Sequence, residues 1–206
     1  NFTCCLMNCC LTILTVSTTD FHKPLYFGHH MRTILIRAGH GNSGVGHWQT
    51  EWATARENCV RVAQNDWERP DCADWFERLE AAVAHYRQFG DVVLAAHSLG
   101  CLLTAYWAER TAHTIQGALL VAPPDPDSTA FPAHATRFSP NVTRPFAFPS
   151  IIVASTNDVY GSFDYATRCA HAWGSDVVCL GEAGHINADS GLGVWDAGWG
   201  LLAGFE

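Results

Sequence analysis

Short strand-like runs alternate with helix-like segments along most of the chain, and this alternation constrains the fold more than any other feature. Several runs are apolar without polar alternation, as expected of strands that are buried on both faces. Strands separated by helices predict βαβ units, a mostly parallel sheet and right-handed crossovers. The predicted strands are Thr33–Ala38, Cys59–Gln64, Asp91–Ala96, Ile115–Ala122, Ser150–Ser155 and Asp176–Leu180.

The segments between these runs carry helix signals at their ends. Asp71 and Ser162 are residue types that cap helix N-termini, while Gly90 and Gly174 follow the same two segments as stop signals. Together with the strands, these helices predict a single-domain α/β fold with helices flanking the sheet. The predicted helices are Asp71–Gln88, Leu99–Thr111, Phe163–Trp173 and, more weakly patterned, Trp195–Phe205.

The composition excludes several classes of protein. The chain has 206 residues, of which 48% are hydrophobic and 16% charged, too apolar a mixture for a disordered chain. Acidic residues outnumber basic ones 20 to 12, and the net charge of −8 makes nucleic acids and anionic membranes poor partners. No apolar run approaches the ~20 residues that span a bilayer.

The N-terminal segment, residues 1–30, differs from the predicted domain at 31–206. It holds two adjacent cysteine pairs, which lack the two-residue gap of zinc knuckles, and its apolar run has no preceding positive charge, unlike a signal peptide. We expect a disordered extension or translated sequence upstream of a start at Met31. The remaining cysteines, interpreted as free and mostly buried thiols in a reducing cytoplasm, are Cys59, Cys72, Cys101, Cys169 and Cys179.

A serine stands between a predicted buried strand and a predicted helix. The motif Ala96-His97-Ser98-Leu99-Gly100 matches the nucleophile elbow G-x-S-x-G, apart from an alanine at its first position. Small residues two positions either side of Ser98 are needed because strand and helix nearly touch at so sharp a turn. The alternative is that Ser98 only caps the following helix.

An acid and a histidine follow two later strands. Asp158 comes just after Ser150–Ser155, and His185 comes after Asp176–Leu180 in Gly181-Glu182-Ala183-Gly184-His185. Serine, acid and histidine in this chain order are typical of an α/β-hydrolase triad. In that mechanism the histidine moves the serine proton and the acid orients the histidine. Asp125 and Asp127 are rival acids.

The first strand ends in a glycine-rich loop that has two interpretations. As an oxyanion loop, it would let the backbone N–H of His40 act with that of Leu99 on a developing negative charge. Alternatively, Gly39, Gly41 and Gly44 spell G-x-G-x-x-G, with Asp66 some twenty residues on, as in dinucleotide sites.

These motifs together resemble the small serine hydrolases related to YdeN and to retinoblastoma-binding protein 9. The matching stretches are Gly39–Gln49, Asp66–Pro70, Ala96–Cys101, Val121–Asp125 and Gly184–Asn187. The resemblance implies a small α/β-hydrolase domain without a large lid, and no metal or organic cofactor. It assigns the nucleophile to Ser98, the acid to Asp158 and the base to His185. It also implies small ester or amide substrates, with peptidase-like activity or protein partners in some members.

Residues near these loops are candidate substrate contacts. They are His47, Trp48, Asp66, Trp67 and Pro123–Asp125. Trp48 and Trp52 are also spaced to pack into a core from a short helix, and His97 is expected to brace the turn rather than react. The sequence therefore predicts a serine hydrolase acting through an acyl-enzyme. The alternatives are a non-catalytic interaction module on the same fold and a dinucleotide-binding protein.

Overall fold

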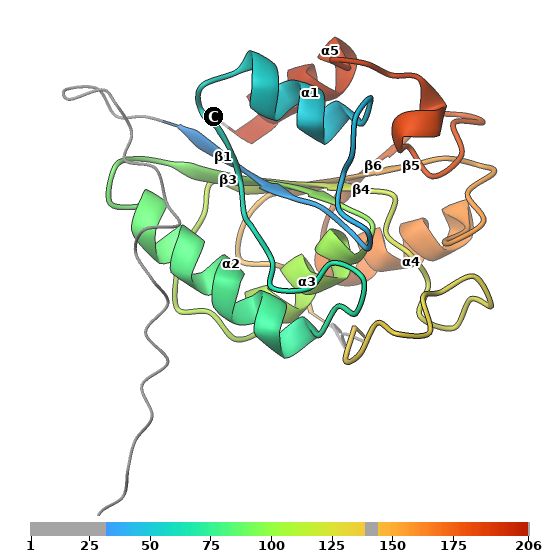
Figure 1. The fold of residues 1–206 in the computed structure, drawn as a ribbon, viewed down its shortest axis with the longest axis horizontal. Helices are drawn as coiled ribbons and strands as arrows, with labels where there is room; N and C mark the ends of the chain where they lie inside the picture. The colour runs from blue at the N-terminus through green and yellow to red at the C-terminus, as the bar shows by residue number, and fades with distance from the viewer. Residues whose placement is uncertain (1–31, 139–143, 206) are drawn as a thin grey trace, which may run out of the picture.

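The strands form one open parallel sheet in the order β2-β1-β3-β4-β5-β6 (Figure 1). This computed structural model describes residues 32–138 and 144–205, so the expected extension at 1–30 lies outside the described residues. All five strand pairs are parallel, which confirms the predicted sheet. The strands are β1 (Thr33–Arg37), β2 (Cys59–Arg61), β3 (Val92–His97), β4 (Gly117–Val121), β5 (Ser150–Ala154) and β6 (Asp176–Cys179).

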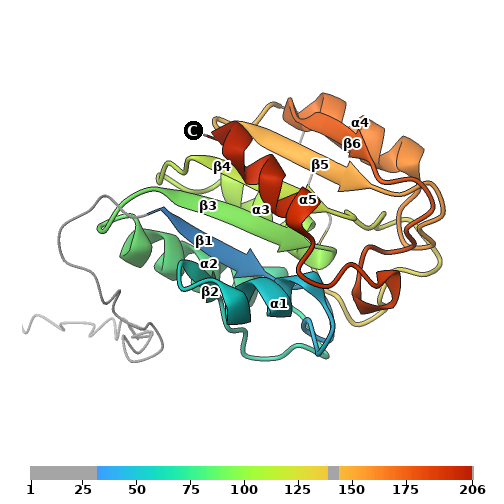
Figure 2. The ribbon, with the colours of Figure 1, turned by 90° about the horizontal axis from the view of Figure 1, so that it is seen from above.

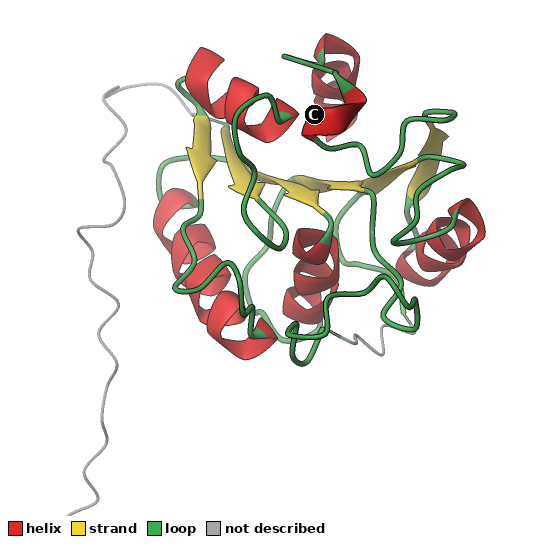
Figure 3. Ribbon diagram, turned by 45° about the vertical axis from the view of Figure 1, so that its right-hand side comes forward, coloured by secondary structure: helices red, strands yellow, loops and turns green. Residues whose placement is uncertain are grey.

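Helices cover both faces of this sheet (Figures 1 and 3). On one face lie α2 (Cys72–Tyr86), α3 (Leu99–Ala108) and α4 (Phe163–Trp173), which contribute to one apolar cluster. On the other face lie α1 (Trp48–Ala55) and α5 (Asp196–Gly200), followed by a 3₁₀ turn at Leu201–Phe205. The fold is thus a three-layer α/β sandwich of the predicted class.

The central strands are buried on both faces. Every residue of β1, β3 and β4 is buried, while the edge strands β2 and β6 are partly exposed. This distribution explains why the central strands read as continuous apolar runs. Arg37 is the one charged residue of β1. Its fully buried guanidinium donates to the Val62 carbonyl oxygen and lies 5.9 Å from the centre of the Trp75 ring.

The helix caps follow the sequence signals. Asp71 accepts hydrogen bonds from the first amides of α2, and Ser162 accepts one from Tyr165 at the start of α4. Gly174 ends α4 with φ of +69°, a conformation that favours glycine. The helix predicted to run to Gln88 ends earlier, at Tyr86, and the predicted closing helix is divided into α5 and the 3₁₀ turn.

The direction in which successive strands are added to the sheet changes between β1 and β3 (Figure 2). From β1 the chain moves outward to β2 and then returns to place β3 on the other side of β1. In open α/β sheets, sites form outside the carboxyl ends of the strands at such a switch point. Gly39 follows β1 and Ser98 follows β3, so both lie at this point.

Two further findings concern thiols and membranes. Within the described residues, Cys59, Cys72, Cys101 and Cys169 are free and buried, and Cys179 is free and exposed. In the same part of the chain, no helix has both the length and the apolar character that crossing a bilayer requires.

Candidate active site

Ser98 occupies a strained turn between β3 and α3. Its φ of +54° and ψ of −124° are rare for a residue with a side chain. A Cβ at Gly100 would lie 2.6 Å from the Arg37 carbonyl oxygen, and one at Gly39 would lie 2.7 Å from the Ser98 Cβ. The chain can adopt this turn because both positions lack side chains. Ser98 is at the N-cap position of α3, yet its hydroxyl makes no capping bond.

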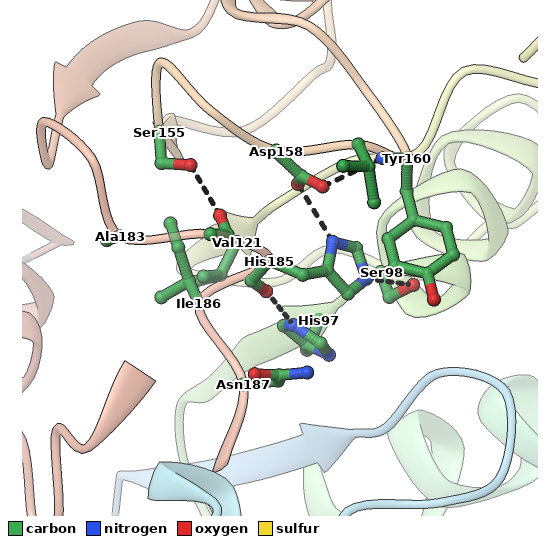
Figure 4. Close-up of polar contacts among 12 residues, drawn as sticks. His97, Ser98, Val121, Ser155, Asp158, Tyr160, Ala183, His185, Ile186 and Asn187 are labelled. Atoms are coloured by element: carbon green, nitrogen blue, oxygen red, sulfur yellow. Dashed lines mark hydrogen bonds and ion pairs between the residues drawn. The ribbon is translucent and has the colours of Figure 1, made fainter. Parts of the chain in front are cut away.

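The hydroxyl instead faces a histidine that is held by a carboxylate (Figure 4). His185 Nε2 lies 2.9 Å from Ser98 Oγ, and His185 Nδ1 lies 2.8 Å from Asp158 Oδ2. The Asp158 side chain is 1% exposed, and its other oxygen accepts a hydrogen bond from the Tyr160 amide at 2.9 Å. The structure therefore brings together the three residues that the sequence analysis selected, from the ends of three different strands.

Several hydrogen bonds fix the loop that carries His185. Its backbone carbonyl oxygen accepts a hydrogen bond from His97 Nε2 at 2.8 Å. The neighbouring Gly184 is held at both ends, since its amide donates to Asn157 Oδ1 at 2.7 Å and its carbonyl oxygen accepts from the Ser155 hydroxyl. Sequence reasoning missed Asn157 and Ser155. Their position between the end of β5 and Asp158 was the available signal, because short polar side chains commonly bond nearby backbone.

The backbone beside Ser98 offers two amide donors. Leu99 is the first residue of α3, so its N–H has no preceding helical carbonyl to bond. His40 follows Gly39, whose Cα packs directly against Ser98. Two hydrogen bonds to the segment Trp67–Glu68 fix the loop that carries His40. Gly41 donates its N–H to the Trp67 carbonyl oxygen at 3.0 Å, and His40 Nε2 donates to the Glu68 carbonyl oxygen at 3.2 Å.

A hollow of about 250 Å³ opens beside Ser98. Besides Ser98 and His185, its wall comprises His40, Asn42, Gly44, His47, His97, Pro124, Pro132, Tyr160, Asn187 and Ala188. Tyr160 was not singled out from the sequence; its ring lies 4.4 Å from that of His185 (Figure 4). A second hollow of about 460 Å³ shares Tyr160, His185 and Asn187 with the first.

Two buried histidines of the first hollow are kept neutral. Burial lowers the pKa of His97 well below its ordinary value, with further lowering by His185 and His47. Burial also lowers the pKa of His47 to about 4, helped by the charges of Arg61 and His185. The rings of His47 and His97 meet edge to face at 4.7 Å, and those of His97 and His185 lie 4.8 Å apart.

The candidate substrate contacts are only partly brought to this hollow. His47 and Pro124 lie in its wall, but Trp48 does not, which corrects its assignment as a substrate contact. Trp48 is 0% exposed because it begins the helix that packs on the sheet, and its indole N–H donates to the Ile186 carbonyl oxygen at 3.0 Å. It therefore supports the loop next to His185.

Asp66 and Trp67 also lie outside the wall of the hollow. The Asp66 carboxylate accepts hydrogen bonds from the amides of Glu68 and Arg69 and so forms a local turn. The Trp67 ring packs against that of Trp75 at 5.4 Å. Through the Trp67 carbonyl oxygen, this segment supports the loop at His40 rather than forming the wall.

Of the two rival acids, Asp125 has other partners. Asp125 accepts the amide N–H of Asp127 at 3.0 Å and lies 3.9 Å from Arg168. The carboxylate that contacts His185 is that of Asp158.

The glycine-rich loop does not have the geometry of a dinucleotide site. Such a site needs a helix that opens directly from the glycines, so that its N-terminus meets the pyrophosphate. Here α1 begins at Trp48, after the last glycine of the pattern, Gly44, and its first turn is capped by His47. In the part of the chain that the structure describes, no three His, Cys, Asp or Glu side chains are arranged to hold a metal ion.

The sequence model of the family described as serine hydrolase matches residues 34–204. The chain belongs to the serine hydrolase family. The matched range includes Ser98, Asp158 and His185, and membership makes hydrolysis the general activity of the chain. No curated protein is similar enough to count as a match.

Solved structures place this hydrolase near the YdeN-like proteins. A YdeN-like hydrolase of Pectobacterium atrosepticum is 32% identical, with a TM-score of 0.74 over 84% of this chain and 90% of that chain. The ydeN gene product of B. subtilis is 17% identical, with a TM-score of 0.67 over 85% and 98%. Est1E of Butyrivibrio proteoclasticus, solved with ferulic acid bound, is 12% identical, with a TM-score of 0.67 over 89% and 92%. The last two share the fold, and the first supports the resemblance to YdeN.

Proposed function

We propose that this serine hydrolase cleaves small esters or amides through an acyl-enzyme formed on Ser98. The observation that carries the proposal is the continuous hydrogen-bonded series from Asp158 through His185 to Ser98, with distances of 2.8 and 2.9 Å. A serine needs a base within hydrogen-bonding reach, and that base needs a group that fixes its orientation. All three side chains are present at the carboxyl end of the sheet.

In the first step, His185 Nε2 takes the Ser98 proton as Oγ attacks the substrate carbonyl carbon. Asp158 holds the Nδ1–H of His185 and stabilises the charged imidazolium that forms. The imidazolium then gives its proton to the leaving alcohol or amine, which departs and leaves the acyl group on Ser98. Water then attacks the acyl carbon while His185 takes one of its protons, and as the bond to Ser98 Oγ breaks, His185 returns this proton to Oγ, which releases the acid and restores the free serine.

The backbone amides of His40 and Leu99 are assigned the stabilisation of the negative charge that develops on the substrate carbonyl oxygen. Gly39 supports this assignment, because its missing side chain lets the His40 segment approach Ser98. Preorganised N–H donors of this kind typically contribute 10²–10³-fold to the rate. The Trp67 and Glu68 carbonyl oxygens hold the donor loop in place.

The size of the hollow favours small substrates. A volume of about 250 Å³ lies at or below the usual range for ligand pockets. The wall segment that contains Pro132 is tied to α2, since the Thr136 hydroxyl donates to Asp71 Oδ2 at 2.8 Å and the Thr136 amide donates to the Pro70 carbonyl oxygen at 3.0 Å. We therefore infer a fixed, open site for short acyl groups rather than a lidded site for lipids.

The test is hydrolysis of a series of short and long acyl esters by the wild type, Ser98→Ala, Asp158→Asn and His185→Ala. Loss of any of the three groups should lower kcat by several orders of magnitude. Thr104→Ser, within α3 and away from the hollow, is the matched control and should keep full activity. Full activity of Ser98→Ala, or turnover only of long-chain lipids, would contradict the proposal.

A further inference from the structure

The Gln49 side chain is a buried amide that joins three segments around the candidate site. Gln49 is 0% exposed and is the second residue of α1. Its Nε2 donates to the Arg37 carbonyl oxygen of β1 at 3.0 Å and to the Ala95 carbonyl oxygen of β3 at 2.9 Å. Its Oε1 accepts a hydrogen bond from the Ser43 hydroxyl at 2.6 Å. One amide group therefore connects β1, β3 and the loop that follows β1.

The three contacts require a side-chain amide at this position. A carbonyl oxygen only accepts hydrogen bonds, so the two contacts of Nε2 need its two N–H donors, and Oε1 is the acceptor for the Ser43 hydroxyl. The carboxylate of a glutamate would face two carbonyl oxygens without a donor. A methionine has a similar length but would leave the same carbonyl oxygens without this partner. Buried polar groups whose hydrogen bonds are all made hold their surroundings in one arrangement.

The two strands that Gln49 joins carry the nucleophile and the assigned oxyanion donors. β1 continues into Gly39 and His40, and β3 continues into Ser98 and Leu99. The Arg37 carbonyl oxygen that Gln49 binds also packs against the turn at Ser98, since a Cβ at Gly100 would lie 2.6 Å from it. Gln49 therefore acts where the end of β1 meets the turn that carries the nucleophile.

The contact with Ser43 fixes the far end of the loop that contains His40. Ser43 is 4% exposed, and its carbonyl oxygen accepts hydrogen bonds from the Thr50 hydroxyl at 2.6 Å and from Arg61 at 3.1 Å. The end of the loop near His40 is held by the two bonds described above. The hydroxyl of Ser43 adds a direct connection from this loop, through Gln49, to both strands.

We propose that Gln49 is a positioning residue that sets the separation between the backbone amides of His40 and Leu99, the two assigned oxyanion donors. This inference rests on the proposed hydrolase function. The two amides follow different strands, so their separation depends on how the ends of β1 and β3 are held together. Donors of this kind act only when both reach the position of the oxyanion, and a displacement of about an ångström can cost about 10²-fold in rate.

A matched pair of substrates reports on these two donors. Phenyl acetate and its thiono analogue differ only in the carbonyl oxygen, which is replaced by sulfur in the analogue. Sulfur is larger and a weaker acceptor, so the thiono substrate gains less from N–H donors placed for oxygen. In Gln49→Met, kcat/KM should fall at least about tenfold for phenyl acetate and much less for the analogue, which lowers the preference for oxygen. An unchanged preference in folded Gln49→Met would overturn the proposal.

Three further variants separate positioning from a general loss of stability. Trp48→Phe removes a buried hydrogen bond from the same turn of α1, but one that supports the loop of His185, so it should slow both substrates equally. Ser150→Ala loses a buried hydrogen bond with Ser175 at the start of β5, the opposite edge of the sheet, and should keep the wild-type preference. Ser43→Ala breaks only the loop contact and should lower the preference by a smaller factor than Gln49→Met. An equal fall of the preference in Trp48→Phe, or no fall in Ser43→Ala where Gln49→Met does not fold, would overturn the proposal.

Hydrogen exchange of the backbone amides tests the positioning without the reaction. Peptides that cover residues 39–46 should exchange faster in Gln49→Met and Ser43→Ala than in the wild type, and at the wild-type rate in Ser150→Ala. Unchanged exchange in Gln49→Met, with wild-type hydrolysis of phenyl acetate intact, would overturn the role of Gln49 and leave the proposed hydrolase function standing. A wild type that hydrolyses neither substrate would instead contradict the proposed function, and with it the catalytic consequence of Gln49.

Discussion

The His97 ring donates a hydrogen bond from Nε2 to the backbone carbonyl oxygen of His185 at 2.8 Å. Because a carbonyl oxygen can only accept, this contact requires the proton of His97 to be on Nε2. The lowered pKa keeps the ring in this neutral form. His97, which directly precedes the nucleophile Ser98 in the chain, thus fixes the main chain of the catalytic base His185.

Replacing His97 should therefore affect catalysis through the position of His185. His97→Ala should lower kcat by up to about tenfold, the value of one hydrogen bond, while KM changes little. His97→Gln, which can still donate from its amide, should recover most of the loss. Steady-state kinetics on a short ester give both parameters, and equal losses in the two variants would exclude the donor as the cause.

The lowered pKa of His47 predicts acid destabilisation. The folded-state value of about 4 lies below the ordinary value of 6.5, so the unfolded chain binds the proton more tightly. The stabilising contribution is fully present above about pH 6.5 and is lost as the pH falls toward 4. Urea unfolding at pH 7 and pH 4.5 should show that the wild type loses on the order of 2 kcal/mol more than His47→Asn. An equal loss of unfolding free energy in the two proteins would contradict the lowered pKa of His47.

Gly39→Ala should impair the site without unfolding the protein. The added Cβ would approach the Ser98 Cβ to 2.7 Å and the His97 carbonyl oxygen to 3.2 Å, so the loop and Ser98 must move apart. We expect at least about a tenfold fall in kcat, since misplacement by an ångström can cost 10²-fold. Gly200→Ala is the control, because a Cβ there meets nothing within 4 Å. A similar kcat for the two variants would count against the close approach.

The hydrogen bond from the Gly184 amide to Asn157 Oδ1 should also support catalysis, because it fixes the loop that carries His185. Asn157→Ala removes the acceptor for the Gly184 amide and should lower both kcat and the free energy of unfolding, the latter by about 1 kcal/mol. Asn157→Asp retains an oxygen in the same place and should restore the kcat measured with a short ester. Failure of the aspartate to recover any activity would mean that the amide group has another role.

The sheet was predictable from sequence because its central strands are buried on both faces and read as apolar runs. The caps at Asp71 and Ser162 were predictable for a local reason, since each residue bonds amides two or three positions away. The C-terminal end of the helix predicted to reach Gln88 was not predictable, because no strong local signal marks Tyr86 as its last helical residue.

The candidate site, too, was predictable only in part. Ser98, Asp158 and His185 could be selected because each follows its own strand, and strand ends meet at one edge of a parallel sheet. The role of Tyr160 could not be predicted, because it depends on a contact with the distant segment that carries His185. For Trp48, the helical spacing with Trp52 correctly indicated packing into the core, but its hydrogen bond to the Ile186 carbonyl oxygen joins segments too far apart in the sequence to be predicted.

The nucleophilic role of Ser98 is tested most directly by reaction of the folded chain with a fluorophosphonate, followed by intact-mass and peptide analysis. We expect one adduct per chain, located on Ser98, that is absent in Ser98→Ala and forms much more slowly in His185→Ala. A folded wild type that stays unlabelled, or labelling that persists in Ser98→Ala, would contradict the assignment of Ser98 as the nucleophile.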